Sequence, residues 1–300
     1  NACMGIMQAV GDSRHPLYYL IISSVTNVCL DLLFIGVFRM GVDGAALATI
    51  LAQFLSAALC LRRLFRTKED HRLVLREIRP DREMLRLILR YGLPSGFQNS
   101  VIGFANVVVQ SNINAFGELA MSGCGAYAKV EGFAFLPITS FTSAITTFVG
   151  QNLGAEEFDR AKKGARFGIL CSLLIAEGIG VITYVFSPVF IGAFCDSQAA
   201  IAFGVDKAHI CALFFCLLAA THCLSAVLRG AGRAMVPMVV MLSVWCVLRV
   251  SILWIAVPIT QSINTVNWVY PITWSISTVV LLIYYRKSDW LHSFQREKAK

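Results

Sequence analysis

The sequence has few charged residues for its length. Only 15% of its 300 residues are Asp, Glu, Lys or Arg, whereas about 25% is usual for soluble domains. Hydrophobic residues make up 57%, and the mean hydropathy is +0.67. A soluble chain of roughly 300 residues cannot hide that much apolar surface in its core, and a disordered chain would be far more polar. The composition therefore excludes both classes.

Motifs for catalysis and for metal binding are also missing. The sequence contains no G-x-S-x-G, H-E-x-x-H or Walker A pattern, so we expect no enzyme activity, no cofactor and no ATP-driven engine. Ten cysteines are present, but none forms a C-x-x-C pair and most lie inside apolar runs. They indicate small apolar helix residues rather than a metal site or a disulfide framework.

Long apolar stretches dominate the chain. A helix needs about 20 mostly apolar residues to cross a bilayer, and eight stretches meet that length. They lie near residues 17–38, 42–61, 88–114, 121–149, 165–187, 208–228, 235–258 and 266–285. Their apolar residues run continuously rather than alternating, which argues against the strands of a membrane barrel. The sequence thus predicts an all-α integral membrane protein, a polytopic bundle in which eight transmembrane helices are seen.

Lys and Arg are distributed unevenly among the connections between these stretches. The connections before residue 17, at 62–90, at 152–166, at 229–233 and after residue 285 carry 1, 10, 4, 2 and 5 Lys and Arg residues, 22 in all. The connections between these carry only Arg39 and Lys207. Because cytoplasmic loops are rich in Lys and Arg, we place both ends of this chain and the 62–90 segment in the cytoplasm. That segment also has helical spacing in DREMLRLILR, which predicts an amphipathic helix along the membrane surface. An ordinary solvated loop is the alternative, and we expect no nucleic-acid partner.

A short sequence pattern occurs twice, once near each end of the chain. The segments from Gly11 to Pro16 and from Gly232 to Pro237 both place Gly five residues before Pro, ahead of an apolar stretch. Pro suits the start of a helix, so chance could produce one such match. Both copies fall on predicted cytoplasmic turns, which favours two homologous halves, the first of them cut short in this chain.

Ionisable residues inside predicted spans are costly to bury and are therefore functional candidates. Asp31 lies deep in the first stretch, with Asn27 one helical turn earlier on the same face and Thr49 on the next helix. A carboxylate, an amide oxygen and a hydroxyl are hard ligands that suit Na⁺, and a desolvated carboxyl group suits H⁺ binding. A packing role for Asp31 is the alternative. The second repeat has Ile252 at the matching position, so the fold itself does not demand an acid there.

Further candidates lie later in the chain. The 88–114 stretch carries several amides, among them Gln98, Asn99 and Asn106, and no acid, so it should face protein or a water-filled cavity. Polar contacts between helices would explain these amides equally well. Lys129 and Glu131 cannot share a helix face, but Glu131 could meet Arg249 from another helix, either as a structural clamp or on a substrate or proton path. We assign no role to Glu177 and expect His222 to be a packed polar residue.

Several motifs run along nearly the whole chain in a familiar order. They are QAVGDSRHP (8–16), GVDGAALAT (41–49), RYGLPSGFQN (90–99), KVEGFAFLPI (129–138), TFVGQNLGA (147–155) and RGAGRAMVP (229–237). Together they resemble the multidrug and toxic compound extrusion (MATE) family of secondary transporters. The resemblance implies twelve helices in two six-helix lobes. This chain would then hold the last two helices of the first lobe (1–61), a cytoplasmic linker (62–86), the second lobe (87–285) and a cytoplasmic tail (286–300).

The resemblance also implies a function. Asn27, Asp31 and Thr49 match the family's cation site in type and spacing, and the absence of a carboxylate from 88–114 resembles the branch that couples ions in the first lobe. The expected protein is a Na⁺- or H⁺-coupled antiporter in the cell membrane, monomeric at full length, that exports organic, cationic amphipathic compounds by alternating access. A lipid-linked saccharide flippase of the same superfamily would need cationic side chains such as Lys129 and Arg249. A nontransporting membrane receptor would bind its ligand without dependence on an ion gradient.

Overall fold

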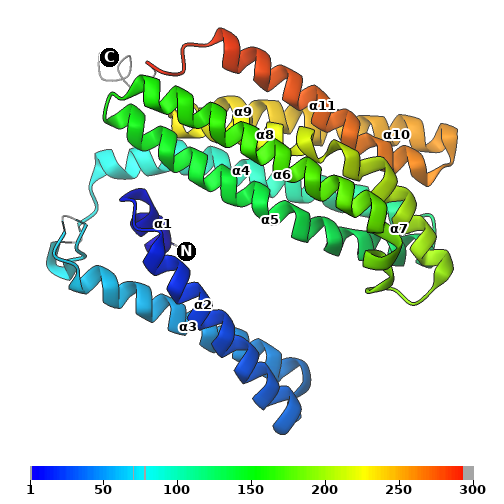
Figure 1. Ribbon diagram of the computed structural model, residues 1–300, viewed down its shortest axis with the longest axis horizontal. Helices are drawn as coiled ribbons and strands as arrows, with labels where there is room; N and C mark the ends of the chain where they lie inside the picture. The colour runs from blue at the N-terminus through cyan, green and yellow to red at the C-terminus, as the bar shows by residue number, and fades with distance from the viewer. Residues whose placement is uncertain (1, 70, 78, 293–300) are drawn as a thin grey trace. The chain divides into compact units, whose positions relative to one another are not determined.

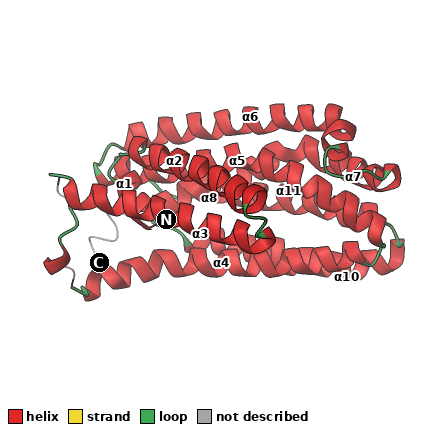
Figure 2. Ribbon diagram, turned by 90° about the horizontal axis from the view of Figure 1, so that it is seen from below, coloured by secondary structure: helices red, strands yellow, loops and turns green. Residues whose placement is uncertain are grey.

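The computed structural model describes residues 2–69, 71–77 and 79–292 (Figure 1). The chain divides into two compact units, residues 1–81 (unit 1) and 82–300 (unit 2). Helices account for all regular structure in the described ranges, without a strand (Figure 2). The prediction of an all-α chain is therefore confirmed.

Unit 1 is built on an antiparallel pair of helices. After α1 (Ala2–Ala9), α2 (Arg14–Asp31) continues directly into a π-helical segment, η1 (Leu32–Val37), and α3 (Gly41–Arg66) returns alongside it. The hydroxyl of Ser23 donates a hydrogen bond of 2.7 Å to the carbonyl of Ala52 and so fixes the register of α2 against α3. A 3₁₀ turn, η2 (Leu75–Glu77), follows.

The described part of unit 2 contains six long helical segments. Three are continuous: α4 (Arg82–Asn114), α5 (Glu118–Gly154) and α6 (Phe158–Gly192). The next is interrupted by a 3₁₀ turn, in the order α7 (Gln198–Cys211), η3 (Ala212–Phe214) and α8 (Phe215–Gly230). A π segment lies in the fifth, in the order α9 (Met235–Met241), η4 (Leu242–Leu248) and α10 (Arg249–Thr260), and α11 (Ile263–Lys287) closes the unit.

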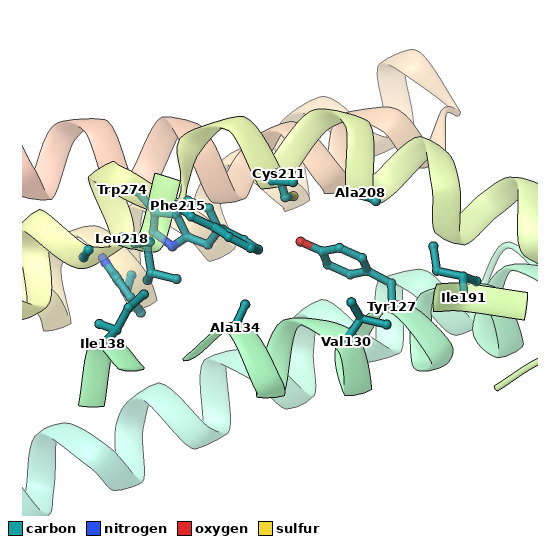
Figure 3. Close-up of a cluster of buried hydrophobic side chains, with 14 of the residues drawn as sticks. Tyr127, Val130, Ala134, Ile138, Ile191, Ala208, Cys211, Phe215, Leu218 and Trp274 are labelled. Carbon is teal, nitrogen blue, oxygen red and sulfur yellow. The ribbon is translucent and has the colours of Figure 1, made fainter. Parts of the chain in front are cut away.

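Small residues allow α5 and α7 to pack closely. A Cβ atom added at Gly123 would overlap the carbonyl oxygen of Ala200, and one added at Gly204 would lie 2.7 Å from the carbonyl oxygen of Gly123. Lipid tails are as apolar as leucine, so helices in a bilayer are held by close packing and interhelical hydrogen bonds rather than by a hydrophobic driving force. The main buried cluster of unit 2 lies beside this contact, around Tyr127 and Phe215 (Figure 3).

Seven helical segments within the described ranges are long and apolar enough to cross a membrane. They include every predicted stretch except 88–114, which forms the second part of α4. That helix has 33 residues, but its amides and its Arg-rich beginning lower its hydropathy. Large apolar side chains remain exposed along the spans, for example Phe54 (73%) and Trp254 (78%), as a lipid-facing surface requires.

Two predicted boundaries are wrong. Residues 188–207 were expected to form a loop, but α6 continues to Gly192 and α7 already begins at Gln198. Lys207 therefore lies inside a helix and is only 4% exposed. The second difference concerns DREMLRLILR: its predicted helix is confirmed from Arg82 onward, but it forms the first turns of α4 and not a separate helix. That helix runs on through Pro94.

Candidate functional site

Asn27 and Asp31 lie one turn apart on α2, as their spacing predicts. The Oδ1 atom of Asp31 and the Nδ2 atom of Asn27 are both buried, and neither has a hydrogen-bond partner within the described ranges. Buried polar atoms are almost always satisfied, so an unpaired carboxylate oxygen requires an explanation. A bound cation or a proton on the carboxyl group would supply one for the Asp31 oxygen, whereas the Nδ2 atom of Asn27 is a hydrogen-bond donor, so Asn27 would ligate a cation only through its Oδ1 atom.

Thr49 is not joined to this pair. The hydrogen bond between Ser23 and Ala52 places Asn27 at the level of Ala48 and Thr49 in the antiparallel pair. The Thr49 side chain is nevertheless exposed, and its hydroxyl donates to the carbonyl of Ala45 in its own helix at 2.9 Å. The structure thus brings Asn27 and Asp31 together on one face and leaves Thr49 beside them, without a hydrogen bond to either residue in the described chain.

The backbone next to Asp31 is π-helical. The segment η1 begins at the following residue, and the amide of Phe38 donates to the carbonyl of Leu33, five residues earlier, at 3.0 Å. A second π segment, η4, ends immediately before Arg249. Such turns are rare and occur frequently at functional sites. Two charges that the sequence places inside spans, Asp31 and Arg249, therefore both border a π segment, which no sequence pattern had indicated.

The two copies of the short repeat adopt the same turn. Gly11 and Gly232 both have positive φ, 89° and 77°. The next amide donates back five residues in each case, from Asp12 to Met7 at 2.9 Å and from Arg233 to Leu228 at 2.8 Å. This is the Schellman arrangement that ends a helix, and the left-handed position explains the glycine. The sequence repeat thus corresponds to a repeated backbone turn.

The side chain of Asp12 connects the first of these turns to neighbouring elements. Its Oδ2 atom lies 2.8 Å from Nδ1 of His15 and 3.9 Å from Nη2 of Arg63. Partial burial raises the pKa of Asp12, but the hydrogen bonds with His15 and the two nearby positive groups outweigh that effect and hold the pKa below its ordinary value. The carboxylate is therefore stabilised in its charged form.

A cavity of about 640 Å³ lies within unit 2. It brings together most of the polar residues predicted for this part of the chain: Gln98, Asn99, Asn106, Glu131 and Arg249. Aromatic side chains, including Phe135, Trp245 and Tyr270, form much of the wall, and Arg229 and His222 add polar groups. An apolar cavity with a few convergent polar groups is the usual form of a small-molecule site.

Lys129 lies apart from this cavity. Its side chain is exposed, and its Nζ atom lies 5.3 Å from the centre of the Phe194 ring. Glu131, two residues later, points to the cavity instead. The expectation that these two residues occupy different helix faces is consistent with this arrangement, and Lys129 does not belong to the site.

Arg249 is fully enclosed. It is 1% exposed, and its Nη2 atom donates a hydrogen bond of 2.7 Å to Oγ1 of Thr273. The guanidinium carbon lies 5.0 Å from the centre of the Trp245 ring and 4.8 Å from that of Tyr270. Glu131 interacts with Arg249 electrostatically, but no nitrogen–oxygen distance within 4.0 Å joins these two described residues. They share a cavity without a direct ion pair.

Lys207 is the charged residue that sequence reasoning missed. Its Nζ atom lies 5.4 Å from the centre of the Tyr127 ring and 4.8 Å from that of Tyr270, and it also interacts electrostatically with Glu131. Figure 3 shows Tyr127 pointing from α5 toward α7, with its hydroxyl group near Cys211. The small residues Ala200 and Gly204, one turn apart and before Lys207, could have indicated a packed helix here.

Glu177 has a structural contact. Its Oε2 atom accepts a hydrogen bond of 3.2 Å from the backbone amide of Cys216. That amide lies just after η3, where the regular helix is interrupted and the first amides of α8 lack their usual helical partners. A Cβ atom at Gly180, one turn after Glu177, would overlap the carbonyl oxygen of Ala212. The Glu177 carboxylate therefore satisfies a backbone amide at the helix break, and α6 packs against that break.

A bundle of membrane-length helices around a partly polar cavity defines a polytopic membrane protein. Comparison with known proteins identifies the family: the family model MatE matches residues 94–255, more than half of the chain. Two curated relatives from Bacillus subtilis are "Probable multidrug resistance protein YoeA", 28% identical over 289 residues, and "Probable multidrug resistance protein YpnP", 30% identical over 251 residues. The chain belongs to the MatE family of membrane transporters, which confirms the resemblance described above.

The matches extend over most of this chain. The first relative aligns with 93% of the chain and 62% of its own length, and the second with 83% and 56%, so the chain spans about 60% of the length of these two relatives. The structure titled "Crystal structure of MATE in the bent conformation" superposes with a TM-score of 0.87 at 21% identity and covers 99% of this chain and 66% of its own. The outward-facing structure of a multidrug resistance MATE family transporter gives 0.85 at 23%, covering 92% and 62%. These structures share the fold.

Proposed function

We propose that the protein exports small organic compounds by antiport against Na⁺ or H⁺. The observation that carries the proposal is the buried carboxylate oxygen of Asp31, unpaired within the described ranges and one turn from Asn27 on a membrane-length helix. The names of the relatives support efflux of drug-like compounds, and transport requires no catalytic group. The family resemblance makes amphipathic organic cations the first substrate class to test.

The ion would act through the charge of Asp31. Na⁺ or H⁺ at this carboxylate removes an uncompensated charge from the membrane interior, and an ion that binds one conformation more tightly shifts the protein toward it. The adjoining π segment is a natural place for such a change, since one extra residue in the turn can be redistributed along a helix. Alternating access then couples release of the ion on one side to export of the substrate on the other.

The wider organisation belongs to the same proposal. We assign residues 1–61 to the first lobe, 62–86 to a linker, 87–285 to a complete six-helix lobe and 286–300 to a tail, with α4 as the first span of that lobe and the seventh of an implied twelve. Because Lys207 lies inside a helix, Arg39 is the one Lys or Arg in the connections that we assign outside the cytoplasm. This distribution supports cytoplasmic ends for this chain. The cell membrane is the proposed location and a monomer the proposed form.

The test compares two aspartates of unit 1 in the full-length protein. Cells lacking other exporters would be loaded with a fluorescent amphipathic cation such as ethidium, and its efflux measured with Na⁺ or pH gradients imposed separately. Asp31→Asn should abolish the response of efflux to the coupling ion. Asp43→Asn, which removes an exposed acid from the first turn of α3, should retain it. Normal efflux with unchanged ion dependence in Asp31→Asn would exclude Asp31 as the coupling group.

A further inference from the structure

The cavity of unit 2 contains more positive than negative charge. The formally charged side chains in its lining are Arg229, Arg249 and Glu131. Lys207 lies directly behind the wall, over the Tyr270 ring that Arg249 also approaches. Among the described residues, the lining and the side chain behind it therefore contribute one carboxylate and three cationic groups. Buried charges without partners are costly in a membrane interior, so this surplus calls for a negatively charged ligand.

Arg249 is the centre of this surplus. Its side chain is 99% buried, one nitrogen is committed to Thr273, and its Nε atom is buried without a partner within the described ranges. Neither Arg249 nor Arg229 has a carboxylate oxygen of a described residue within 4.0 Å. Glu131 could neutralise only one of its two electrostatic neighbours, Lys207 and Arg249. The group around Arg249 thus keeps a net positive charge and a free hydrogen-bond donor.

The rest of the cavity wall suits a ligand with an aromatic ring system. Phe135 and Trp245 both lie edge-on to the ring of His222, at 5.0 and 5.6 Å between centres, and all three side chains line the cavity. The Nε2 atom of His222 is a further buried polar atom without a partner in the described chain. The volume of about 640 Å³ lies in the range of sites for small organic ligands. The cavity therefore offers an aromatic wall next to a cationic group.

We propose that this cavity binds an amphipathic aromatic compound through an anionic group, a carboxylate, sulfonate or phosphate, held by Arg249. Guanidinium groups bind such planar or multidentate anions through charge-assisted hydrogen bonds, and the aromatic part of the ligand would lie against Trp245 and Phe135. The inference rests on the proposed transport function and narrows its substrate class. The charge is opposite to that of the organic cations implied by the family resemblance.

The experiment measures equilibrium binding of two dyes that share a xanthene ring system. Fluorescein is anionic and rhodamine 6G is cationic, and fluorescence anisotropy with the purified full-length protein reports the affinity of each. We expect tighter binding of fluorescein. Arg249→Gln should weaken fluorescein binding about tenfold or more, the loss expected for one charge-assisted hydrogen bond, whereas Arg249→Lys should retain part of it.

Two further variants keep the test independent of folding defects. Lys129→Gln removes a positive charge from α5 outside the cavity and should leave the affinity for fluorescein unchanged. Glu131→Gln removes the one carboxylate that described residues contribute to the lining and should strengthen fluorescein binding. Preferential binding of rhodamine 6G, equal losses in Arg249→Gln and Lys129→Gln, or weaker binding in Glu131→Gln would each overturn the proposal.

Competition separates an organic anion from a free inorganic one. Inorganic phosphate should displace fluorescein only at far higher concentration than the dye itself, because phosphate cannot use the aromatic wall; displacement at equal concentration would contradict the organic class. Binding is measured without any gradient, so Asp43→Asn, which removes an exposed acid of unit 1, should bind fluorescein like the wild type. Failure of dye binding would therefore leave the ion-coupled transport proposal standing, and loss of ion dependence alone would leave the anion site standing.

Discussion

The close approach of α5 and α7 makes a strong prediction about one glycine. In Gly123→Ala, the new Cβ atom would overlap the carbonyl oxygen of Ala200 and lie 3.0 Å from the amide nitrogen of Gly204. Both neighbours are backbone atoms, so no side-chain rotation can relieve the overlap and the two helices must separate. Gly125→Ala is the matched control, since a Cβ atom there meets nothing within 4 Å.

The two substitutions should have opposite effects on stability. Alanine gains roughly 0.5–1 kcal/mol over glycine within a helix, and overpacking typically costs about 1–3 kcal/mol. We expect Gly123→Ala to lose about 1–2 kcal/mol net and Gly125→Ala to gain up to about 1 kcal/mol. At roughly 2–4 °C for each kcal/mol, thermal unfolding in detergent should separate the two variants by several degrees.

Equal melting temperatures for these variants would refute the reasoning. That result would mean that α5 and α7 lie further apart than described, and that Lys207 is not held against Tyr127. A lower melting temperature for Gly123→Ala, accompanied by weaker fluorescein binding, would instead link this packing contact to the cavity.

Two other contacts give predictions of the same kind. Because the folded-state pKa of Asp12 is lowered, its carboxylate stabilises the fold above the unfolded pKa of about 3.9, and that contribution disappears as the pH falls through the folded value. Denaturant unfolding between pH 3 and 7 should show that the wild type is more stable than Asp12→Asn by less than about 1 kcal/mol at pH 7, since solvent screens this pair. The difference should shrink as the pH falls toward 3; a constant difference would contradict this sign. Glu177→Leu should lower the free energy of unfolding by about 1–3 kcal/mol, because it leaves the amide of Cys216 unsatisfied. Glu177→Gln keeps an acceptor and should have a melting temperature close to that of the wild type. Equal losses in the two variants would show that the hydrogen bond is not the cause.

Much of the fold could be predicted because membrane spans are a local property of the sequence. Continuous apolar runs are long enough to cross a bilayer whatever their neighbours, and the described helices contain nearly all of every predicted run. The turn at Gly11 was equally predictable, since its repeat at Gly232 has the same Gly-to-Pro spacing. The start of α7 was not, because Asp206, Lys207 and His209 resemble a polar loop until the aromatic rings that enclose Lys207 are placed.

In the candidate sites, the arrangement of residues on one helix could be predicted from the sequence, whereas contacts between helices could not. The spacing of Asn27 and Asp31 fixes their common face, since both belong to one helix. The surroundings of Arg249 depend on tertiary structure: Thr273 and Tyr270, which it contacts, come from α11, and Glu131, which lines the same cavity, comes from α5. A sequence alone does not say whether Glu131 and Arg249 touch or only share a cavity, nor that π segments adjoin Asp31 and Arg249, because π turns depend on local packing.

Flux in reconstituted vesicles tests the central claim most directly. The full-length protein would be placed in sealed liposomes with a Na⁺ or H⁺ gradient as the only energy source. Movement of the exported dye in the direction opposite to the ion flow would then be measured. The account predicts dye accumulation that requires the gradient, stops when an ionophore dissipates it, and is lost in Asp31→Asn but kept in Asp43→Asn. Dye movement of equal rate and extent with no gradient, or an undiminished gradient response in Asp31→Asn, would contradict ion-coupled antiport through this carboxylate.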